Sequence, residues 1–176
     1  MKDNNNIYND IHSEKLSPQA IELEESILGT ILVEQKSLIF IIDILTPEVF
    51  YKDIHKRIYS AILSLFSRSE PVDILTITNE LKKTGELEKI GGAYFITQLT
   101  NRVASTTNID YYVHVIIEKY LRRELINISS EITKVAYDDT IDIFELLEKT
   151  EKQIFDINNK TFKTRYLFHN FPNIYI

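Results

Sequence analysis

The sequence predicts an all-α protein in which a globular bundle of about six helices precedes a long helical hairpin. Apolar residues recur every three or four positions along almost the whole chain, and no stretch alternates cleanly enough to indicate a strand. Proline and glycine stand at the ends of several periodic runs, where helices commonly begin and end. The longest run stops at an acidic turn and is followed by a second periodic run, which indicates two antiparallel helices.

The first part of the chain predicts three helices. Ser17–Pro18 supplies a serine cap and a proline at the first helical position, where a missing N–H costs nothing, so we expect a helix over 18–33. A short second helix is expected over 36–45. Thr46–Pro47 repeats the opening signal and predicts a third helix that continues to Ser67.

Two further helices follow in the predicted bundle. Asp73 comes after a proline-containing loop and is placed to cap a helix that runs to Lys83 and ends near Gly85. Gly91–Gly92 then opens the next helix. A glycine pair at a helix N-terminus could bind an anion, but a tight turn that enters a helix is the favoured interpretation.

The longest periodic run predicts a projecting hairpin. Asn108 caps it, and a helix over 109–137 would measure about 43 Å. Asp138–Thr140 breaks this helix, and a return helix reaches Ile157. A compact domain of this size does not cover such rods, so their apolar stripe would face water unless copies of the chain pack on it. The alternative is that the hairpin folds back over the bundle. The candidate self-association residues are Ile116, Tyr120, Ile128, Phe144, Leu147 and Ile154.

The predicted organisation has four regions. These are an N-terminal arm (1–16), a globular helical domain (17–107), a self-associating hairpin (108–157) and a C-terminal tail (158–176). The arm is polar, and we expect it to be disordered. The aromatic residues of the tail follow no clear period and Pro172 interrupts any helix, so we expect the tail to be disordered as well.

Composition excludes several classes of protein. The chain has 176 residues and no cysteine, which excludes disulfides, zinc–thiolate sites and thiol nucleophiles. Residues 1–158 carry 17 basic and 26 acidic side chains, net −9, and such a surface repels phosphate backbones. We therefore expect protein partners and no direct DNA binding. No apolar run approaches the ~20 residues that span a bilayer, and the start lacks a signal peptide, so we expect a cytoplasmic protein.

No residue is predicted to be catalytic or to bind a cofactor or a metal. The four histidines are scattered without a second ligand at suitable spacing. We expect His55 to have a packing or capping role and Asp53 to anchor a helix start. Glu22 and Glu25 are expected on a solvated helix face. Arg122–Arg123 is flanked by glutamates, which favours salt bridges over contact with nucleic acid.

Six segments in a fixed order carry a family resemblance. They are Pro18–Gly29, Val49–His55, Pro71–Thr76, Ile90–Tyr94, Asn108–Tyr112 and Glu118–Ile126. No segment alone is diagnostic, but their order and spacing resemble the N-terminal domain of replicative DNA helicases of the DnaB family. The similarity runs from about Pro18 to about Ile157. It implies a helical globule followed by a hairpin, pairing of hairpins within a hexameric ring described as a trimer of dimers, and a primase that this ring receives.

The resemblance also implies a motor that this sequence does not contain. Family members continue into a RecA-like ATPase whose phosphate-binding loop needs glycines, a lysine and a serine or threonine. The four glycines of this chain begin no such motif. ATP and magnesium would belong to that missing motor, so we expect the chain alone to be inactive as an ATPase and helicase. The tail over 158–176 does not match the linker that the resemblance implies, and a shifted reading frame is the favoured explanation for it, with an artificial end or a docking peptide as alternatives.

The leading hypothesis is an oligomerisation and primase- or loader-docking domain that acts in DNA replication and meets DNA only through the full helicase. One alternative is a free-standing regulator or adaptor that pairs with the full-length helicase and modulates it. The helicase-binding domain of a bacterial primase has a similar fold, but the order of the segments favours the helicase. A helix-turn-helix DNA binder would need a basic recognition helix, which the acidic balance opposes.

Overall fold

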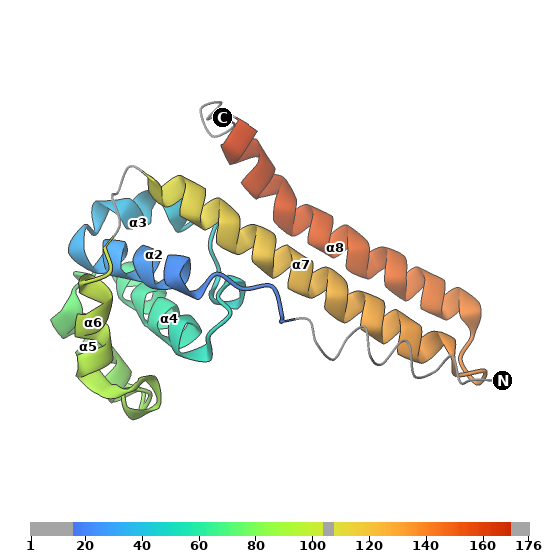
Figure 1. Ribbon diagram of the computed structural model, residues 1–176, viewed down its shortest axis with the longest axis horizontal. Helices are drawn as coiled ribbons and strands as arrows, with labels where there is room; N and C mark the ends of the chain where they lie inside the picture. The colour runs from blue at the N-terminus through green and yellow to red at the C-terminus, as the bar shows by residue number, and fades with distance from the viewer. Residues whose placement is uncertain (1–15, 104–107, 170–176) are drawn as a thin grey trace.

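The computed structural model describes residues 16–103 and 108–169, and it confirms the all-α fold (Figure 1). Within these residues the chain forms helices and turns and no strand. Figure 1 shows a globule of short helices from which two long helices project. The predicted N-terminal arm lies outside the described residues except for Leu16.

The globule consists of five α-helices and the first part of a sixth. Each presents apolar residues to its neighbours, and that packing fixes their arrangement. The helices are α2 (Ile21–Val33), α3 (Lys36–Ile41), α4 (Asp53–Ser67), α5 (Ile74–Lys83) and α6 (Gly92–Thr100), with 3-10 turns η1 (Pro47–Val49) and η2 (Glu88–Ile90). The start of α7 (Ile109–Ala136) packs against α2 and η1 and completes the predicted bundle.

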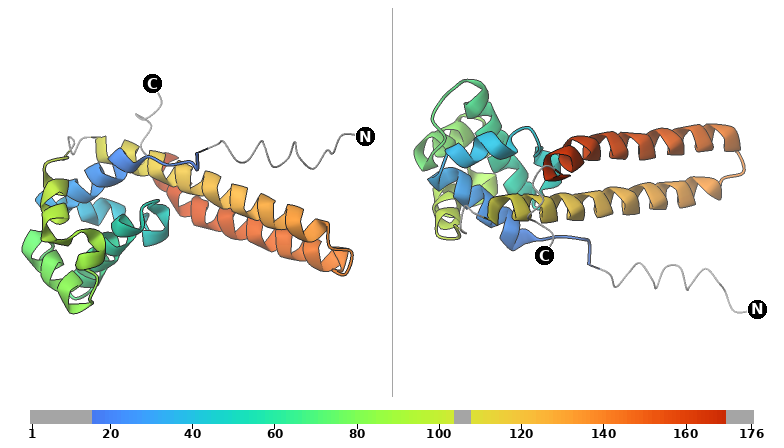
Figure 2. Two further views of the ribbon diagram at one scale, coloured as in Figure 1. Left: turned by 60° about the horizontal axis from the view of Figure 1, so that its bottom comes forward. Right: turned by 90° about the horizontal axis from the view of Figure 1, so that it is seen from above.

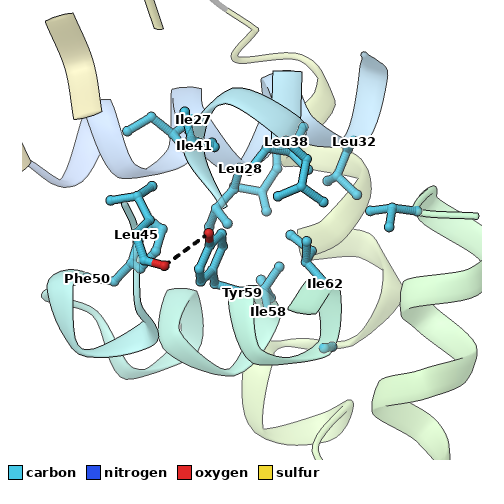
Figure 3. Close-up of a cluster of buried hydrophobic side chains, with 14 of the residues drawn as sticks. Ile27, Leu28, Leu32, Leu38, Ile41, Leu45, Phe50, Ile58, Tyr59 and Ile62 are labelled. Carbon is cyan, nitrogen blue, oxygen red and sulfur yellow. Dashed lines mark hydrogen bonds between the residues drawn. The ribbon is translucent and has the colours of Figure 1, made fainter. Parts of the chain in front are cut away.

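A continuous apolar core lies between these helices (Figure 3). Ile27 and Leu28 of α2 lie across from Ile58 and Tyr59 of α4, and all four side chains are fully buried. The Tyr59 hydroxyl donates a 3.4 Å hydrogen bond to the carbonyl oxygen of Leu45, and burial raises the pKa of Tyr59. Each large apolar side chain buried in this way stabilises the fold by about 1.5–3 kcal/mol.

Glycines permit two tight features of the globule. A Cβ at Gly29 of α2 would collide with the backbone carbonyl oxygen of Leu99 in α6, so the close approach of these helices requires glycine. Gly91, immediately before α6, has φ +90°, a left-handed conformation that glycine adopts without strain. The predicted glycine turn into this helix is therefore confirmed.

Asp73 caps α5, as the sequence predicts. Its carboxylate accepts hydrogen bonds from the backbone N–H groups of Leu75 and Thr76, each at 2.9 Å. In return, the Thr76 hydroxyl accepts the backbone N–H of Asp73 at 2.9 Å. This reciprocal arrangement satisfies donors that a helix N-terminus otherwise leaves open.

The predicted helix over 46–67 is instead two elements. η1 ends after one turn, the backbone at Phe50 and Lys52 is extended, and α4 then begins. The first two helices are also shorter than predicted, since α2 begins at Ile21 and α3 ends at Ile41. These are corrections to boundaries, and the order of helices is as predicted.

A carboxylate from another helix explains the break before α4. Lys52 stands at the N-cap of α4 and has no acceptor side chain to offer. Glu24 of α2 instead binds the extended backbone just before α4, because its two carboxylate oxygens accept the backbone N–H groups of Tyr51 at 2.6 Å and Lys52 at 3.4 Å. A continuous helix would place these two N–H groups in its own ladder and take both of them away from the buried Glu24 carboxylate.

The two long helices form an antiparallel hairpin. α7 has 28 residues, and α8 (Ile143–His169) returns beside it, so that the two rods run side by side (Figure 2). In the turn, Asp138 accepts hydrogen bonds from the backbone N–H and the hydroxyl of Thr140 at 3.0 and 2.6 Å. Such local side-chain bonds compete with helix continuation, which accounts for the predicted break.

The return helix extends beyond its predicted end. We expected the hairpin to finish at Ile157 and residues 158–176 to form a disordered tail, but α8 continues to His169. No proline or glycine occurs over 158–169, so no residue in that segment stops the helix, and Pro172 lies beyond it. The last seven residues of the predicted tail lie outside the described residues.

Candidate functional site

The hairpin projects from the globule and does not fold back over it (Figures 1 and 2). The buried residues of α7 all lie in its first half, and they are Ile109, Val113, Ile116, Ile117 and Tyr120. Beyond Tyr120, no described residue of α7 is buried. The main packing partner of α8 is α7. The alternative in which the bundle shelters the hairpin is therefore wrong, and the surface of the hairpin is open to solvent.

The seam between the two long helices is apolar but thin. Ile128, Ile132 and Val135 of α7 are half-buried. Leu146 and Ile157 of α8 are 8% and 9% exposed, and they are the buried residues over 143–159. Over 143–159, most of the apolar surface of α8 therefore faces away from α7.

Large apolar side chains gather on one flank of the hairpin, which we call the apolar flank. Leu147 and Ile154 of α8 are 58% and 44% exposed, and Leu125 of α7 is 48% exposed. Phe144 beside them is 76% exposed. The apolar flank comprises Leu125, Ile143, Phe144, Leu147 and Ile154, whereas the exposed Phe155 points about 180° away from the seam residue Leu146. Side chains of this size seldom gather in water without a partner.

The ion pair between Glu131 and Lys149 marks one side of the hairpin as polar, and the apolar flank lies on the opposite side. The Glu131 carboxylate of α7 accepts hydrogen bonds from Lys149 Nζ at 2.7 Å and from Gln153 Nε2 at 3.0 Å, both on α8. At about 100° per residue, Leu147 and Ile154 point about 140–160° away from Lys149 around α8. Leu125 points about 120° away from Glu131 around α7. One flank is thus polar and the other apolar.

The polar flank consists of Glu131, Lys149 and Gln153 and contributes little to the stability of the hairpin. The Lys149 ammonium lowers the pKa of Glu131, and the Glu131 carboxylate raises the pKa of Lys149. Both side chains are exposed, so water and salt screen their attraction. The polar flank therefore sets the orientation of the helices, and the apolar flank is the candidate interaction surface.

Two of the predicted self-association residues are assigned wrongly. Ile116 is fully buried and Tyr120 is 9% exposed, both in the core of the globule. They lie on the part of α7 that packs against α2 and η1. Periodicity in the sequence shows that they share a face with the distal residues of α7, but it does not show where the globule stops covering that face.

The other four predicted residues lie on the free part of the hairpin. Ile128 is half-buried in the seam, and Phe144, Leu147 and Ile154 lie on the apolar flank. Their role in self-association stays a prediction. Sequence reasoning left out the exposed residues Leu125 and Ile143, which plotting both helices about the Glu131 contact would have placed on this flank.

A buried polar cluster lies beneath the base of the hairpin. Glu24 is 1% exposed, and its carboxylate lies 2.7 Å from Nδ1 of the fully buried His55. The His55 ring stacks on Phe95 at a centroid distance of 6.0 Å, and its Nε2 has no hydrogen-bond partner among the described residues. These contacts fit the predicted packing or capping role of His55.

Arg123 joins three parts of the chain at this junction. Its guanidinium donates hydrogen bonds to the carbonyl oxygens of Pro18 at 2.8 Å and Val49 at 2.7 Å. It also lies over the rings of Tyr51 and Tyr120, at 5.4 and 5.8 Å from their centroids. The expectation of a salt bridge is wrong for Arg123, because backbone carbonyls and aromatic faces receive its charge.

Two neighbouring charges also have particular partners. Arg122 forms an ion pair of 2.6 Å with Glu118, four residues earlier in the same helix, and not between helices. Glu25, expected on a solvated face, has a side chain only 14% exposed and lies 2.8 Å from Arg102 Nη1. Packing of α2 against α6 removes Glu25 from water and explains this correction.

A cavity of about 830 Å³ opens beside Arg123. Its lining includes Leu16, Pro18, Lys56, Arg123 and Ile126. Glutamates contribute to the lining as well as these basic residues, so its charge points to no ligand class. In the part of the chain that the structure describes, no three His, Asp or Glu side chains gather where they could hold a metal ion. No helix there has the length and apolar character to cross a membrane.

Known proteins share this architecture. A family model described as "DnaB-like helicase N terminal domain" matches residues 16–118. The replicative DNA helicase DnaB of Rhodothermus marinus is 43% identical over 145 residues, which cover 82% of this chain and 15% of that protein. The replicative DNA helicase DnaC of Bacillus subtilis is 34% identical over 167 residues, which cover 95% of this chain and 36% of that protein. The chain thus spans about a third or less of these relatives.

Solved structures agree with the sequence relatives. The crystal structure of the N-terminal domain of DnaB helicase from Mycobacterium tuberculosis superposes with a TM-score of 0.75 at 31% identity, covering 80% of this chain and 99% of that one. A DnaB-like replicative helicase, described with its interactions with primase, superposes with a TM-score of 0.62 at 26% identity over 78% of this chain and 30% of that one. The family model matches more than half of the chain and confirms the resemblance seen in its six segments: the chain belongs to the family of DnaB-like helicase N-terminal domains.

Proposed function

We propose that this chain is the assembly and docking module of a replicative DNA helicase and that it acts in the cytoplasm. The observation that supports this most directly is the apolar flank, which the globule leaves uncovered. Membership of the family supports a place in DNA replication. The alternative of a free-standing regulator gains no support from these observations.

Two copies of the chain would pair through the apolar flank. A two-fold axis brings the same patch of both copies together, so the exposed leucine and isoleucine side chains of one copy face the apolar flank of the other. Burial of apolar surface contributes about 25 cal/mol per Å². The proposed pair would be the unit from which a hexameric ring, a trimer of dimers, is built.

Two substitutions that introduce negative charge on the apolar flank test the pairing. Leu147→Glu combined with Ile154→Glu places two carboxylates on the apolar flank, where pairing would bury them without partners. We expect the parent chain to self-associate at high micromolar concentration in sedimentation velocity, and the double variant to stay monomeric. Lys152→Glu is the matched control, because it changes the net charge by the same amount on an exposed face of α8 away from the flank.

The outcome that would overturn the pairing is specific. A parent chain that sediments as a monomer throughout that range removes the role of the flank. Unchanged association of the double variant does the same. Loss of association in Lys152→Glu as well would mean that net charge, and not the flank, controls the behaviour.

We also propose that the assembled domain receives a primase and a helicase loader. The helicase of similar structure that is described with its interactions with primase supports the primase. Isothermal titration of primase into this chain is the test, and saturable binding is the expected result. Binding to the parent chain but not to the Leu147→Glu, Ile154→Glu variant would show that primase recognises the paired form.

The chain should not hydrolyse ATP. The expected site of ATP and magnesium is a motor domain, and this sequence has no phosphate-binding loop. A coupled ATPase assay should give background rates with and without single-stranded DNA. Turnover that survives repurification would contradict the proposal, and a full-length replicative helicase serves as the positive control.

A further inference from the structure

The direction of the hairpin depends on how α7 is held where it leaves the globule. α7 crosses from the core into the hairpin without a break. Its last buried side chain is Tyr120, and the main neighbour of α8 is α7 itself. The contacts at the edge of the globule therefore decide the direction in which the second half of α7 continues.

Arg123 is the anchor at that edge. It lies three residues beyond Tyr120, and its two hydrogen bonds reach Pro18, before α2, and Val49, in η1. These acceptors lie 105 and 74 residues away along the chain. Charge-assisted hydrogen bonds from a planar guanidinium to two separate carbonyls restrict movement in more than one direction.

The position of Arg123 gives it leverage over tilting. The packed part of α7, from Ile109 to Tyr120, is about 16 Å long, and the free part from Arg123 to Ala136 is about 20 Å long. A tilt at the edge is therefore magnified at the turn of the hairpin. An anchor at the outer end of the packed part opposes such a tilt more strongly than one near its middle.

The groups that Arg123 contacts are themselves held in place. Glu24 accepts the backbone N–H of Tyr51, whose ring lies under the guanidinium. Burial lowers the pKa of Arg123 and the nearby Glu24 carboxylate opposes that change, so the guanidinium keeps its charge. The buried cluster of Glu24 and His55 thus gives Arg123 a rigid base on α2 and α4.

We propose that Arg123 is a positioning residue that sets the direction in which the hairpin leaves the globule. If hairpins pair as proposed above, this direction determines where the two globules lie relative to each other. The assignment itself concerns a single chain and stands whether or not the chains pair.

Distance measurements within one chain test the assignment. The sequence has no cysteine, so spin labels can be attached at Lys83→Cys in α5 and Asp139→Cys in the hairpin turn, both exposed. The measurement is made in the Leu147→Glu, Ile154→Glu background and with excess unlabelled chain, so that distances between copies do not contribute. Arg123→Gln should broaden the distance distribution by about half its width, because both charge-assisted bonds are lost.

Two further variants make the result decisive. Arg122→Gln, which removes only the ion pair with Glu118, should leave the distribution unchanged. Arg123→Lys keeps the charge but not the fork to two carbonyls, so it should broaden the distribution while thermal unfolding remains cooperative. Superposable distributions for the parent and both Arg123 variants would overturn the assignment. Loss of cooperative unfolding in both would also overturn it, since Arg123 would then maintain the fold and not a direction.

Discussion

The globule and the hairpin bury their apolar residues to very different extents. In the globule, residues such as Ile27, Phe50 and Ile62 come from distant parts of the sequence and are completely enclosed. In the hairpin, five of the seven large apolar residues over 143–159 of α8 remain more than 40% exposed, and Leu146 and Ile157 are the buried ones. The globule thus encloses its large apolar side chains, whereas the hairpin leaves most of those over 143–159 in contact with water.

The difference follows from geometry. A helix in a bundle has neighbours on several sides, but each helix of an isolated hairpin has one. Two helices side by side cover one stripe of each, and any wider apolar face stays in water. The apolar face of α8 is wider than the seam with α7, and the residues outside the seam are therefore the ones that indicate a partner.

Truncation of a core residue should have the largest effect. Tyr59→Ala should lower the free energy of unfolding by about 3–5 kcal/mol, because it leaves a large cavity in the globule. Phe144→Ala on the hairpin should change it by less than about 0.5 kcal/mol, because that ring is exposed in the single chain. Chemical denaturation of both variants at a concentration where the chain is monomeric makes the comparison. Similar losses would mean that the hairpin is packed as tightly as the globule.

A single added methyl group should have the next largest effect. Gly29→Ala would force α2 and α6 apart at the carbonyl of Leu99, with an expected loss of about 1–3 kcal/mol. Glu22→Ala, on an exposed face of the same helix, is the control and should be nearly neutral. If thermal unfolding shows no loss for Gly29→Ala, the helices are not in close contact there.

Sequence reasoning recovered what depends on neighbouring residues. The cap at Asp73, the glycine turn before α6 and the break at Asp138 are local hydrogen-bonding or backbone effects, so a few adjacent residues determine them. The order of the helices follows from apolar periodicity, which is local in the same sense. The hairpin also follows from that periodicity, and the family resemblance implies the same arrangement.

Sequence reasoning failed where a residue acts across the fold. Glu24 interrupts a helix 27 residues later, and Arg123 binds carbonyls that no spacing rule connects to it. Ile116 and Tyr120 have the same periodicity as the free part of α7 but are buried in the core of the globule. Each of these depends on which elements meet in space, and one sequence carries no local signal for that.

Acid should destabilise the globule in part through Glu80. Its side chain is 9% exposed, and hydrogen bonds from Arg68 at 2.8 Å and Ser64 at 2.9 Å lower its pKa. A lowered carboxyl pKa in the folded state adds stability that is present above the unfolded pKa, about 4.3, and is lost as pH falls through the folded value. Glu80→Gln should therefore flatten the fall in stability below about pH 5. Glu88→Gln, at an exposed carboxylate, should leave that pH dependence as it is.

The smallest effect should come from the polar flank of the hairpin. Lys149→Ala removes the interhelical ion pair with Glu131, but both groups are exposed and Gln153 still donates to the same carboxylate. Water and salt already screen this pair, so thermal unfolding of the monomer should shift by no more than the measurement error. Self-association should also persist, because the apolar flank is unchanged. Loss of pairing in Lys149→Ala would show that the polar flank contributes directly to the contact between copies, and the two sides of the hairpin would no longer have separate roles.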